Sequence, residues 1–258
     1  MVEPIRSRAN ARLKAARRLQ AKRHRRTAGL FLAEGEDIVE EALSAGILPA
    51  ETFVADGREP PQELVARLER GGPVHAVEPA LLAELGSLGH PARVICVFAA
   101  ERLPQRAVGA DLGVHLHRVI DPGNVGTVVR AAGALGPAFL SLSPGCSDPL
   151  SAKGIRASMG AVFRVPIEQH ELPPEDGLTR VALVTDAPAA LWELDLSGPV
   201  LFVVGAERHG LPPEVLAGCD TAAAIPQAAG AESLNAAAAA TVALYEAVRQ
   251  RAARSTSP

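Results

Sequence analysis

The apolar positions form two kinds of run along the chain: short runs that suit buried strands, and longer ones with helical spacing. The strand-like runs lie at residues 52–55, 74–77, 94–99, 114–120, 139–142, 181–184, 200–204 and 221–225. Apolar residues three and four positions apart predict helices between them. These helices span residues 11–23, 36–45, 60–69, 79–85, 125–135, 151–159 and 233–250. Strands that alternate with helices predict an α/β fold with a largely parallel sheet.

A break in this alternation divides the chain. Residues 101–110 introduce proline, glycine and charge between two regular stretches, which is typical of a linker. We therefore expect a small α/β domain at 31–100 and a larger one at 111–258. Residues 1–30 are expected to form a separate basic arm.

The N-terminal arm carries an unusual concentration of positive charge. Residues 1–26 hold ten Lys or Arg and one Glu, a net charge of +9, whereas the whole chain has a net charge of −3. Such an asymmetry indicates a polyanionic partner. Within the predicted helix, Ala15, Ala16 and Leu19 would form an apolar stripe. A solvated helix and an RNA-contacting arm fit these residues equally well.

Cysteine and histidine usage argues against disulfides and metal sites. Cys96, Cys146 and Cys219 are widely spaced and form no CxxC pair, so we expect neither a disulfide framework nor structural zinc. His115 and His117 alternate on a predicted strand, where a core or surface role is the simpler interpretation. No apolar run is long enough for a membrane span, and no signal peptide is expected. The sequence predicts a cytoplasmic protein without a metal.

The first of three polar turns that follow apolar strands is Asp121–Arg130. Ligands of open α/β sheets bind at the carboxyl ends of strands, so such turns are candidate site elements. Its glycines, Gly123 and Gly126, lack the GxGxxG spacing of a dinucleotide site. Asn124 is predicted to cap a helix. Arg130, nearly two turns later on the Asn124 side of that helix, suits a phosphate or a developing oxyanion. A plain cap and a solvated charge explain the same residues.

The other two turns are also generic when each is taken alone. Gly205 follows a buried strand, where glycine lets a ligand approach the backbone, and Glu207 is a carboxylate in the same loop. This loop lacks the Gly-Lys-Ser/Thr of a phosphate-binding P-loop. In the third turn, Ser233 is predicted to cap the last helix and Asn235 to lie in its first turn.

Together, these motifs resemble the SpoU/TrmH family of RNA ribose methyltransferases, within the SPOUT superfamily. The likeness rests on N-x-x-x-x-x-R, then G-x-E-x-x-G-L, then I-P…S-L-N…LYE, and on the segment RASMGAVFRVPI. RSRANARLKAARRLQ and GLFLAEGEDIVEEAL are similar to the family's small substrate-binding domain, which has a fold like that of a ribosomal RNA-binding protein. The resemblance covers nearly the whole chain.

The resemblance implies a fold and an activity. The catalytic domain is expected to be a parallel-sheet SPOUT domain with a C-terminal trefoil knot, in a homodimer whose active site is completed across the interface. It would transfer a methyl group from S-adenosylmethionine to a ribose 2′-hydroxyl of structured RNA, with 23S ribosomal RNA favoured over transfer RNA. By position match, Thr185, Gly205, Ile225 and Leu234 would contact the cofactor.

The resemblance also implies the catalytic set, which comprises Arg130, Asn124, Ser233, Asn235 and Glu207. A free guanidinium is always charged at neutral pH and cannot act as a base. We therefore expect Arg130 to bind the nucleotide phosphate and stabilise the forming alkoxide, with Ser233 or Asn235 orienting it. Glu207 would shape the cofactor loop or the dimer interface.

Three departures from the family pattern leave cofactor affinity and substrate choice open. Ala206 stands where relatives often have Asn, Gln227 stands where they often have Met, and a glycine is displaced to Gly230. Two alternatives also remain. One is a SPOUT enzyme that methylates a base nitrogen, and the other is a non-catalytic RNA-binding or ribosome-assembly factor.

Overall fold

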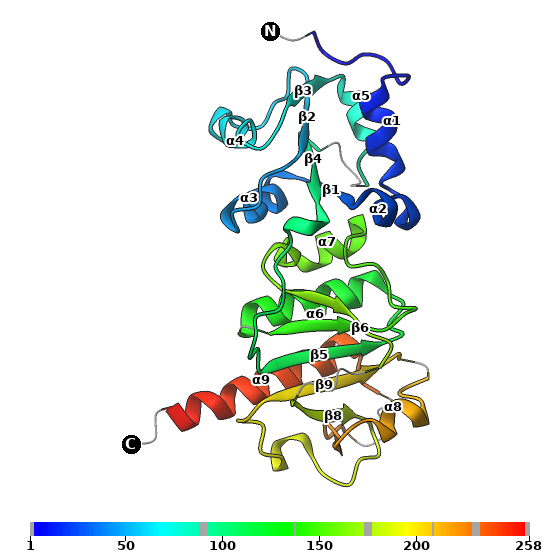
Figure 1. The fold of residues 1–258 in the computed structure, drawn as a ribbon, viewed down its shortest axis with the longest axis vertical. Coiled ribbons are helices and arrows are strands. Elements are labelled where there is room, and N and C mark those ends of the chain that lie inside the picture. The colour runs from blue at the N-terminus through cyan, green and yellow to red at the C-terminus, as the bar shows by residue number, and fades with distance from the viewer. Residues whose placement is uncertain are drawn as a thin grey trace. The chain divides into compact units, whose positions relative to one another are not determined.

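A computed structural model shows that the chain divides into two compact units (Figure 1). The small unit comprises Met1–Leu103 and Asp148–Arg164, and the large unit comprises Pro104–Ser147 and Val165–Pro258. The structure describes residues 3–87, 92–136, 138–172, 177–207, 209–228 and 233–255. This division differs from the predicted one, because the basic N-terminus and a segment from the middle of the chain both belong to the small unit.

The small unit is built on a four-stranded sheet in the order β1-β4-β2-β3. The strands are β1 (Leu30–Glu34), β2 (Glu51–Ala55), β3 (Val74–Val77) and β4 (Val94–Ala99). β4 is antiparallel to both β1 and β2, and β2 is parallel to β3. β1 was not predicted, whereas the other three strands lie where the apolar runs placed them.

The basic N-terminus forms two helices rather than a single one over 11–23. They are α1 (Ala11–Arg18) and α2 (Lys22–Ala28). Three further helices, close to their predicted positions, are α3 (Glu36–Ser44), α4 (Gln62–Leu68) and α5 (Pro79–Ala83). α1 and α5 lie on one side of the sheet in Figure 1, and α3 and α4 lie on the other.

Helix α1 is part of the core of the small unit. Its side of the sheet is covered by Leu13, Ala16 and Leu19, which pack in one cluster with Phe53 and other buried residues. Ala15, which we expected in the apolar stripe, is exposed. Leu13 and Ala16, three residues apart, lie on the same face of α1, and Leu19 follows as the residue that caps its end. The N-terminus is therefore a folded element and not a detached arm.

A segment from the middle of the chain completes the other side of this unit. It contains α7 (Ala152–Ser158) and the short 3-10 helix η2 (Ala161–Phe163). The Phe163 ring lies 5.9 Å from the Phe31 ring and 4.9 Å from the Phe98 ring, measured between centroids. All three rings are fully buried. The small unit therefore needs this distant segment to close its aromatic core.

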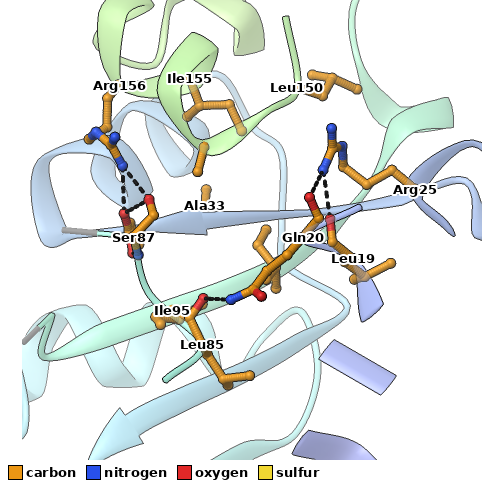
Figure 2. Close-up of a pocket in the computed structure, with 13 residues that line it drawn as sticks. Leu19, Gln20, Arg25, Ala33, Leu85, Ser87, Ile95, Leu150, Ile155 and Arg156 are labelled. Carbon is orange, nitrogen blue, oxygen red and sulfur yellow. Dashed lines mark hydrogen bonds and ion pairs between the residues drawn. The ribbon is translucent and has the colours of Figure 1, made fainter. Parts of the chain in front are cut away.

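Two buried charged residues hold the same segment in place. Arg25, with 8% of its side chain exposed, donates from Nε and Nη2 to Asp148 Oδ2 at 2.9 and 2.6 Å. Its Nη1 donates to the carbonyls of Leu19 and Gln20, both at 2.8 Å (Figure 2). With these partners the buried guanidinium is compensated, as a buried charge must be to persist.

The second charge is Glu34, with 7% of its side chain exposed. It accepts from the Ser87 backbone N–H at 2.7 Å, from the Ser87 hydroxyl at 2.6 Å and from Arg156 Nη1 at 2.9 Å. Both charged residues line a cavity of about 320 Å³, whose remaining wall is largely apolar. Each carboxylate and guanidinium of this wall already has partners within the small unit.

The large unit is built on a six-stranded sheet in which every neighbouring pair is parallel, in the order β10-β8-β9-β5-β6-β7. The strands are β5 (Leu112–His117), β6 (Phe139–Leu142), β7 (Ile167–Gln169), β8 (Thr179–Leu183), β9 (Val200–Gly205) and β10 (Thr221–Ala223). β7 was not predicted. β5 ends at His117, three residues earlier than the apolar run suggested.

Helices cover both faces of this sheet. α6 (Pro122–Leu135) and α9 (Ala236–Ser255) pack against each other and against the sheet. On the opposite face, Leu211 and Val215, the latter in α8 (Pro213–Ala217), pack against Ala182 and Val203. This is the layered α/β arrangement that the alternating pattern predicted. In the part of the chain that the structure describes, no helix combines the length and the apolar character that a membrane span needs.

We expect Asp148→Asn to lower the free energy of unfolding by about 3 kcal/mol or more, because it leaves the Arg25 guanidinium buried without its counter-charge. Urea denaturation of the full chain would measure this change. The matched control is Glu36→Gln, which removes the same charge from an exposed pair with Arg93, where the side chains are 44% and 24% exposed. That control is expected to cost less than about 1 kcal/mol. Equal midpoints for the Asn variant and the wild-type chain would contradict the prediction.

Candidate functional site

The carboxyl ends of three adjacent strands define the candidate site. β8, β9 and β5 are parallel neighbours in the centre of the large sheet. His117, the last residue of β5, pairs in register with Gly205, the last residue of β9. Because parallel strands end at a common edge, the loops that follow them converge there. Two cavities lie at this edge.

The first, which we call the Gly205 cavity, has a volume of about 650 Å³. Thr185, Gly205, Ile225 and Leu234, the four predicted cofactor contacts, all line it. Ser233 lines it too. Its volume falls within the range of about 300–1,000 Å³ that is usual for small-molecule sites. Residues from three connections, those after β8, β9 and β10, therefore share one cavity.

The second, which we call the Asn124 cavity, has a volume of about 940 Å³. Asn124, Asn235 and Glu207 line it, together with His117 and Asp121. It shares four wall residues with the Gly205 cavity, which are Ala206, Glu207, His209 and Gly210. The two cavities therefore adjoin along the loop that follows β9.

That loop folds back tightly on the end of its own strand. The Gly210 N–H donates to the Ala206 carbonyl at 2.8 Å. A Cβ on Gly205 would lie 2.3 Å from the backbone carbon and oxygen of Gly210. Because backbone atoms cannot move aside as a flexible side chain can, only glycine fits at this position in this loop conformation.

One chain of hydrogen bonds joins the three sequence motifs. The Asn124 side-chain amide donates to Glu207 Oε1, and Asn124 Oδ1 accepts from Asn235 Nδ2 at 3.1 Å. Asn235 is in turn fixed by its own helix, because its Oδ1 accepts from the backbone N–H groups of Ala237 and Ala238. These bonds fix the orientation of both amides at the wall of the Asn124 cavity.

The two predicted helix caps are corrected by this geometry. α6 begins at Pro122, and its cap is Asp121, whose carboxylate accepts from the Gly123 and Asn124 N–H groups at 2.6 and 3.1 Å. Asn124 lies in the first turn, which leaves its amide available to the cavity. α9 begins at Ala236, and the capping bonds come from Asn235 rather than from Ser233. The sequence placed Asn124 and Ser233 at the helix caps, whereas the caps are Asp121 for α6 and Asn235 for α9.

Arg130 lies apart from the other predicted catalytic residues. Its side chain is exposed and lines neither cavity. No side-chain partner for it is found among the described residues. Six residues along an α-helix correspond to about 600° of rotation, so Arg130 and Asn124 face directions about 120° apart. The described structure therefore does not bring Arg130 to the wall that Asn124 lines, and its catalytic role stays a prediction.

The sequence interpretation missed His117. Its residue is 6% exposed and lines the Asn124 cavity, and neither ring nitrogen has a hydrogen-bond partner in the described part of the chain. Burial, and then the nearby Arg118 charge, lowers the pKa of His117, so the ring is neutral at physiological pH. Its position at the carboxyl end of an apolar strand was the available signal.

His115, two residues earlier on the same face of β5, has a different setting. It is fully buried, and its Nδ1 lies 2.8 Å from the Ser141 hydroxyl. Burial lowers the pKa of His115 to about 3. Among the described residues there is no group of three or more His, Cys, Asp or Glu side chains placed to hold a metal ion.

Two family patterns match the sequence. Residues 111–245 match the SpoU rRNA Methylase family, and residues 10–96 match the MRM3-like substrate binding domain. The first match alone covers more than half of the chain. The chain belongs to the SpoU rRNA methylase family. The predicted family and its parallel-sheet α/β fold are therefore both confirmed.

Curated relatives and solved structures extend the likeness over nearly the whole chain. A tRNA/rRNA methyltransferase of Synechocystis is 36% identical over 99% of this chain and 97% of its own length. A Streptomyces viridochromogenes 23S rRNA (uridine(2479)-2′-O)-methyltransferase is 34% identical over 94% and 91%. An AdoMet-bound rRNA methyltransferase structure from Sinorhizobium meliloti has a TM-score of 0.81 and 32% identity, covering 96% of this chain and 97% of that one. The AdoMet complex of AviRb from S. viridochromogenes has a TM-score of 0.83 and 31% identity, with coverages of 94% and 98%.

The neutral state of His115 makes the fold sensitive to acid. Below pH 6.5 the unfolded chain binds a proton at this ring, whereas the folded chain does not bind it until about pH 3. Stability due to this residue is therefore complete above pH 6.5 and falls as the pH decreases, by about 2 kcal/mol at pH 5. Urea unfolding at pH 7.5 and pH 5 should show a smaller difference in His115→Gln than in the wild-type chain. An unchanged difference would contradict this assignment.

Proposed function

We propose that this chain transfers a methyl group from S-adenosylmethionine to a ribose 2′-hydroxyl of structured RNA, with 23S ribosomal RNA favoured over transfer RNA. The observation that carries the proposal is the Glu207–Asn124–Asn235 hydrogen-bond chain at the junction of the two cavities. It joins the three motifs that characterise the family and leaves room for a small molecule on one side and a nucleotide on the other. The named activity of the Streptomyces relative supports the same reaction.

The Gly205 cavity is the proposed cofactor site. Its wall offers backbone groups at Gly205 and Ile225 and apolar side chains at Val204 and Leu211, which suit a ligand with an adenine ring and a polar amino-acid tail. When bound, S-adenosylmethionine supplies a methyl group on a positively charged sulfur. Ala206 and Gln227, two departures from the family pattern, both line this wall, and Gly230 lies outside the described residues. The C-terminal knot that the family implies stays a prediction.

The Asn124 cavity is the proposed site of the accepting nucleotide. The Asn124 and Asn235 amides are held by their own hydrogen bonds before any substrate arrives. Prepositioned groups of this kind lower the barrier chiefly by orienting the reactants. Here they would direct the ribose hydroxyl toward the adjoining cavity, and Ser233 would act from the wall of that cavity.

We propose that Arg130 acts in the active site of a second copy of the chain. Its exposed position outside both cavities suits a group that completes a neighbouring site. An exposed stripe on α9 supports dimer formation, because Val242 and Tyr245 are 41% and 56% exposed. Exposed apolar side chains on adjacent turns of a helix are typical of an interaction surface. Ala238 and Arg249 extend the same stripe.

The deciding experiment is transfer of radiolabelled methyl groups to ribosomal and transfer RNA. We expect Arg130→Ala and Asn124→Ala each to lower kcat by about 100-fold or more, since each removes a group that stabilises developing charge or fixes the reactants. Arg130→Lys should also be impaired, because an ammonium cannot reproduce the planar fork of a guanidinium. The labelled nucleotide should be resistant to alkali at its 3′ linkage.

Other outcomes identify the alternatives. Mixing the Arg130→Ala and Asn124→Ala chains should restore activity that neither has alone, if the two residues act across a dimer interface. Label in an alkali-sensitive linkage would indicate methylation of a base. No transfer to either RNA, with no binding of S-adenosylmethionine by calorimetry, would favour a non-catalytic RNA-binding protein.

The small unit offers the proposed RNA-binding surface. Of its N-terminal basic residues, Arg8, Arg12 and Arg17 form ion pairs with acidic residues of the same unit. Among the basic residues of α1 and α2, Lys14, Arg18, Arg23 and Arg26 are exposed and have no acidic partner in the described part of the chain. These four are free to contact phosphates. Of the two interpretations of the N-terminus, RNA contact is therefore proposed for these four side chains, which lie on two folded helices.

We expect a Lys14→Ala/Arg18→Ala double variant to reduce the slope of log affinity against log salt by roughly 1.4, at about 0.7 for each lost contact to single-stranded RNA. An Arg23→Ala/Arg26→Ala variant should behave similarly. Arg67→Ala/Arg70→Ala, on and just after α4, is the control and should leave the slope unchanged. These substitutions spare Leu13, Ala16 and Leu19, which a deletion of the N-terminus would remove from the core. Identical slopes for all variants would exclude α1 and α2 from the RNA interface.

A further inference from the structure

His117 is a buried polar side chain whose hydrogen-bonding capacity is unsatisfied among the described residues. Neither of its ring nitrogens has a hydrogen-bond partner among the described residues, and both nitrogens are covered from solvent. A neutral imidazole carries one N–H donor and one acceptor nitrogen. Most buried polar side-chain atoms in folded proteins are paired, so such a residue calls for an explanation beyond packing.

The position of His117 gives that explanation. It is the last residue of β5, it pairs in register with Gly205, and it lines the same cavity as Asn124, Glu207 and Asn235. Gly205 begins the loop that separates the two cavities. His117 therefore lies at the floor of the proposed nucleotide site, on the side next to the proposed cofactor site.

His209 and His115 show what distinguishes this residue. His209 lines both cavities, but its side chain is exposed, so water satisfies its hydrogen bonds. His115 is also buried and on the same face of β5. Its Nδ1 is bonded to Ser141, its Nε2 has no partner among the described residues, and it lines none of the cavities described above. Among the described histidines, only His117 has both ring nitrogens buried without a partner and also lines a cavity.

We propose that His117 contacts the methyl-accepting nucleotide and hydrogen-bonds to it, so that the substrate supplies the partner that the folded chain lacks. Because His117 lines the cavity, a change in its side-chain rotamer on substrate binding would let a ring nitrogen meet the nucleotide. Ribose hydroxyls both donate and accept, so a nucleotide suits a neutral imidazole in either orientation. This inference rests on the proposed function and adds a substrate-positioning residue to it.

The test separates a substrate contact from a structural role, because the two predict opposite effects on stability. Replacing an unpaired buried polar group with an apolar one of similar size is neutral or stabilising for the fold. We therefore expect His117→Leu to unfold at the same urea concentration as the wild-type chain or a higher one. Its kcat/KM for RNA should fall about tenfold or more, the loss expected when a substrate hydrogen bond is removed. S-adenosylmethionine affinity, measured by calorimetry, should stay within about twofold.

Two further variants complete the experiment. His117→Asn keeps one donor and one acceptor and should recover part of the lost kcat/KM. His115→Leu, the matched change two residues away, should leave kcat/KM for RNA near the wild-type value. Wild-type kcat/KM in His117→Leu would overturn the proposal, and so would a parallel loss of stability and activity that His117→Asn does not rescue. Absence of methyl transfer by the wild-type chain would instead overturn the proposed function, and this inference with it.

Discussion

The parallel pairing of β5 with β9 is the constraint on which the candidate site depends. It brings His117 and Gly205 to the same level of the sheet, although 88 positions separate them in the numbering of the chain. The loop after β9 then folds over its own strand, which is possible only because Gly205 has no side chain. From this edge, α6 follows β5, and the connections after β8 and β10 supply further residues of the cavity walls.

Helix capping and site formation are coupled at this edge. Asp121 satisfies the first N–H groups of α6, so Asn124 can direct its amide toward Glu207 and Asn235. Asn235 uses its oxygen to cap α9 and its nitrogen to reach Asn124. The Asn235 amide thus caps the start of α9 and links that helix to α6. Because both ends of the amide are bonded, its direction is set before a substrate binds, which is the condition for effective positioning.

The core of the small unit is built from chain segments that lie far apart in sequence. Phe163 closes an aromatic cluster begun by Phe31 and Phe98, and Asp148 neutralises the buried Arg25. The chain leaves the large unit after Ser147 and returns to it at Val165. The connection between β6 and β7 is therefore also a structural part of the small unit. Through this segment, the stability of the small unit depends on residues that belong by sequence to the catalytic half.

The sequence by itself determined the α/β class, most strands, the family and the predicted site residues other than Arg130, all of which line one of the two cavities. Those properties follow from local patterns: apolar runs, helical spacing, and the order of polar turns after strands. Tertiary structure decided the rest. The position of Leu13 in the core, the cap at Asp121, the direction of Arg130 and the burial of His117 each depend on what lies opposite a residue in space. A sequence pattern reports which faces are apolar, but not which partner a polar group will find there, and at His117 the described residues supply none.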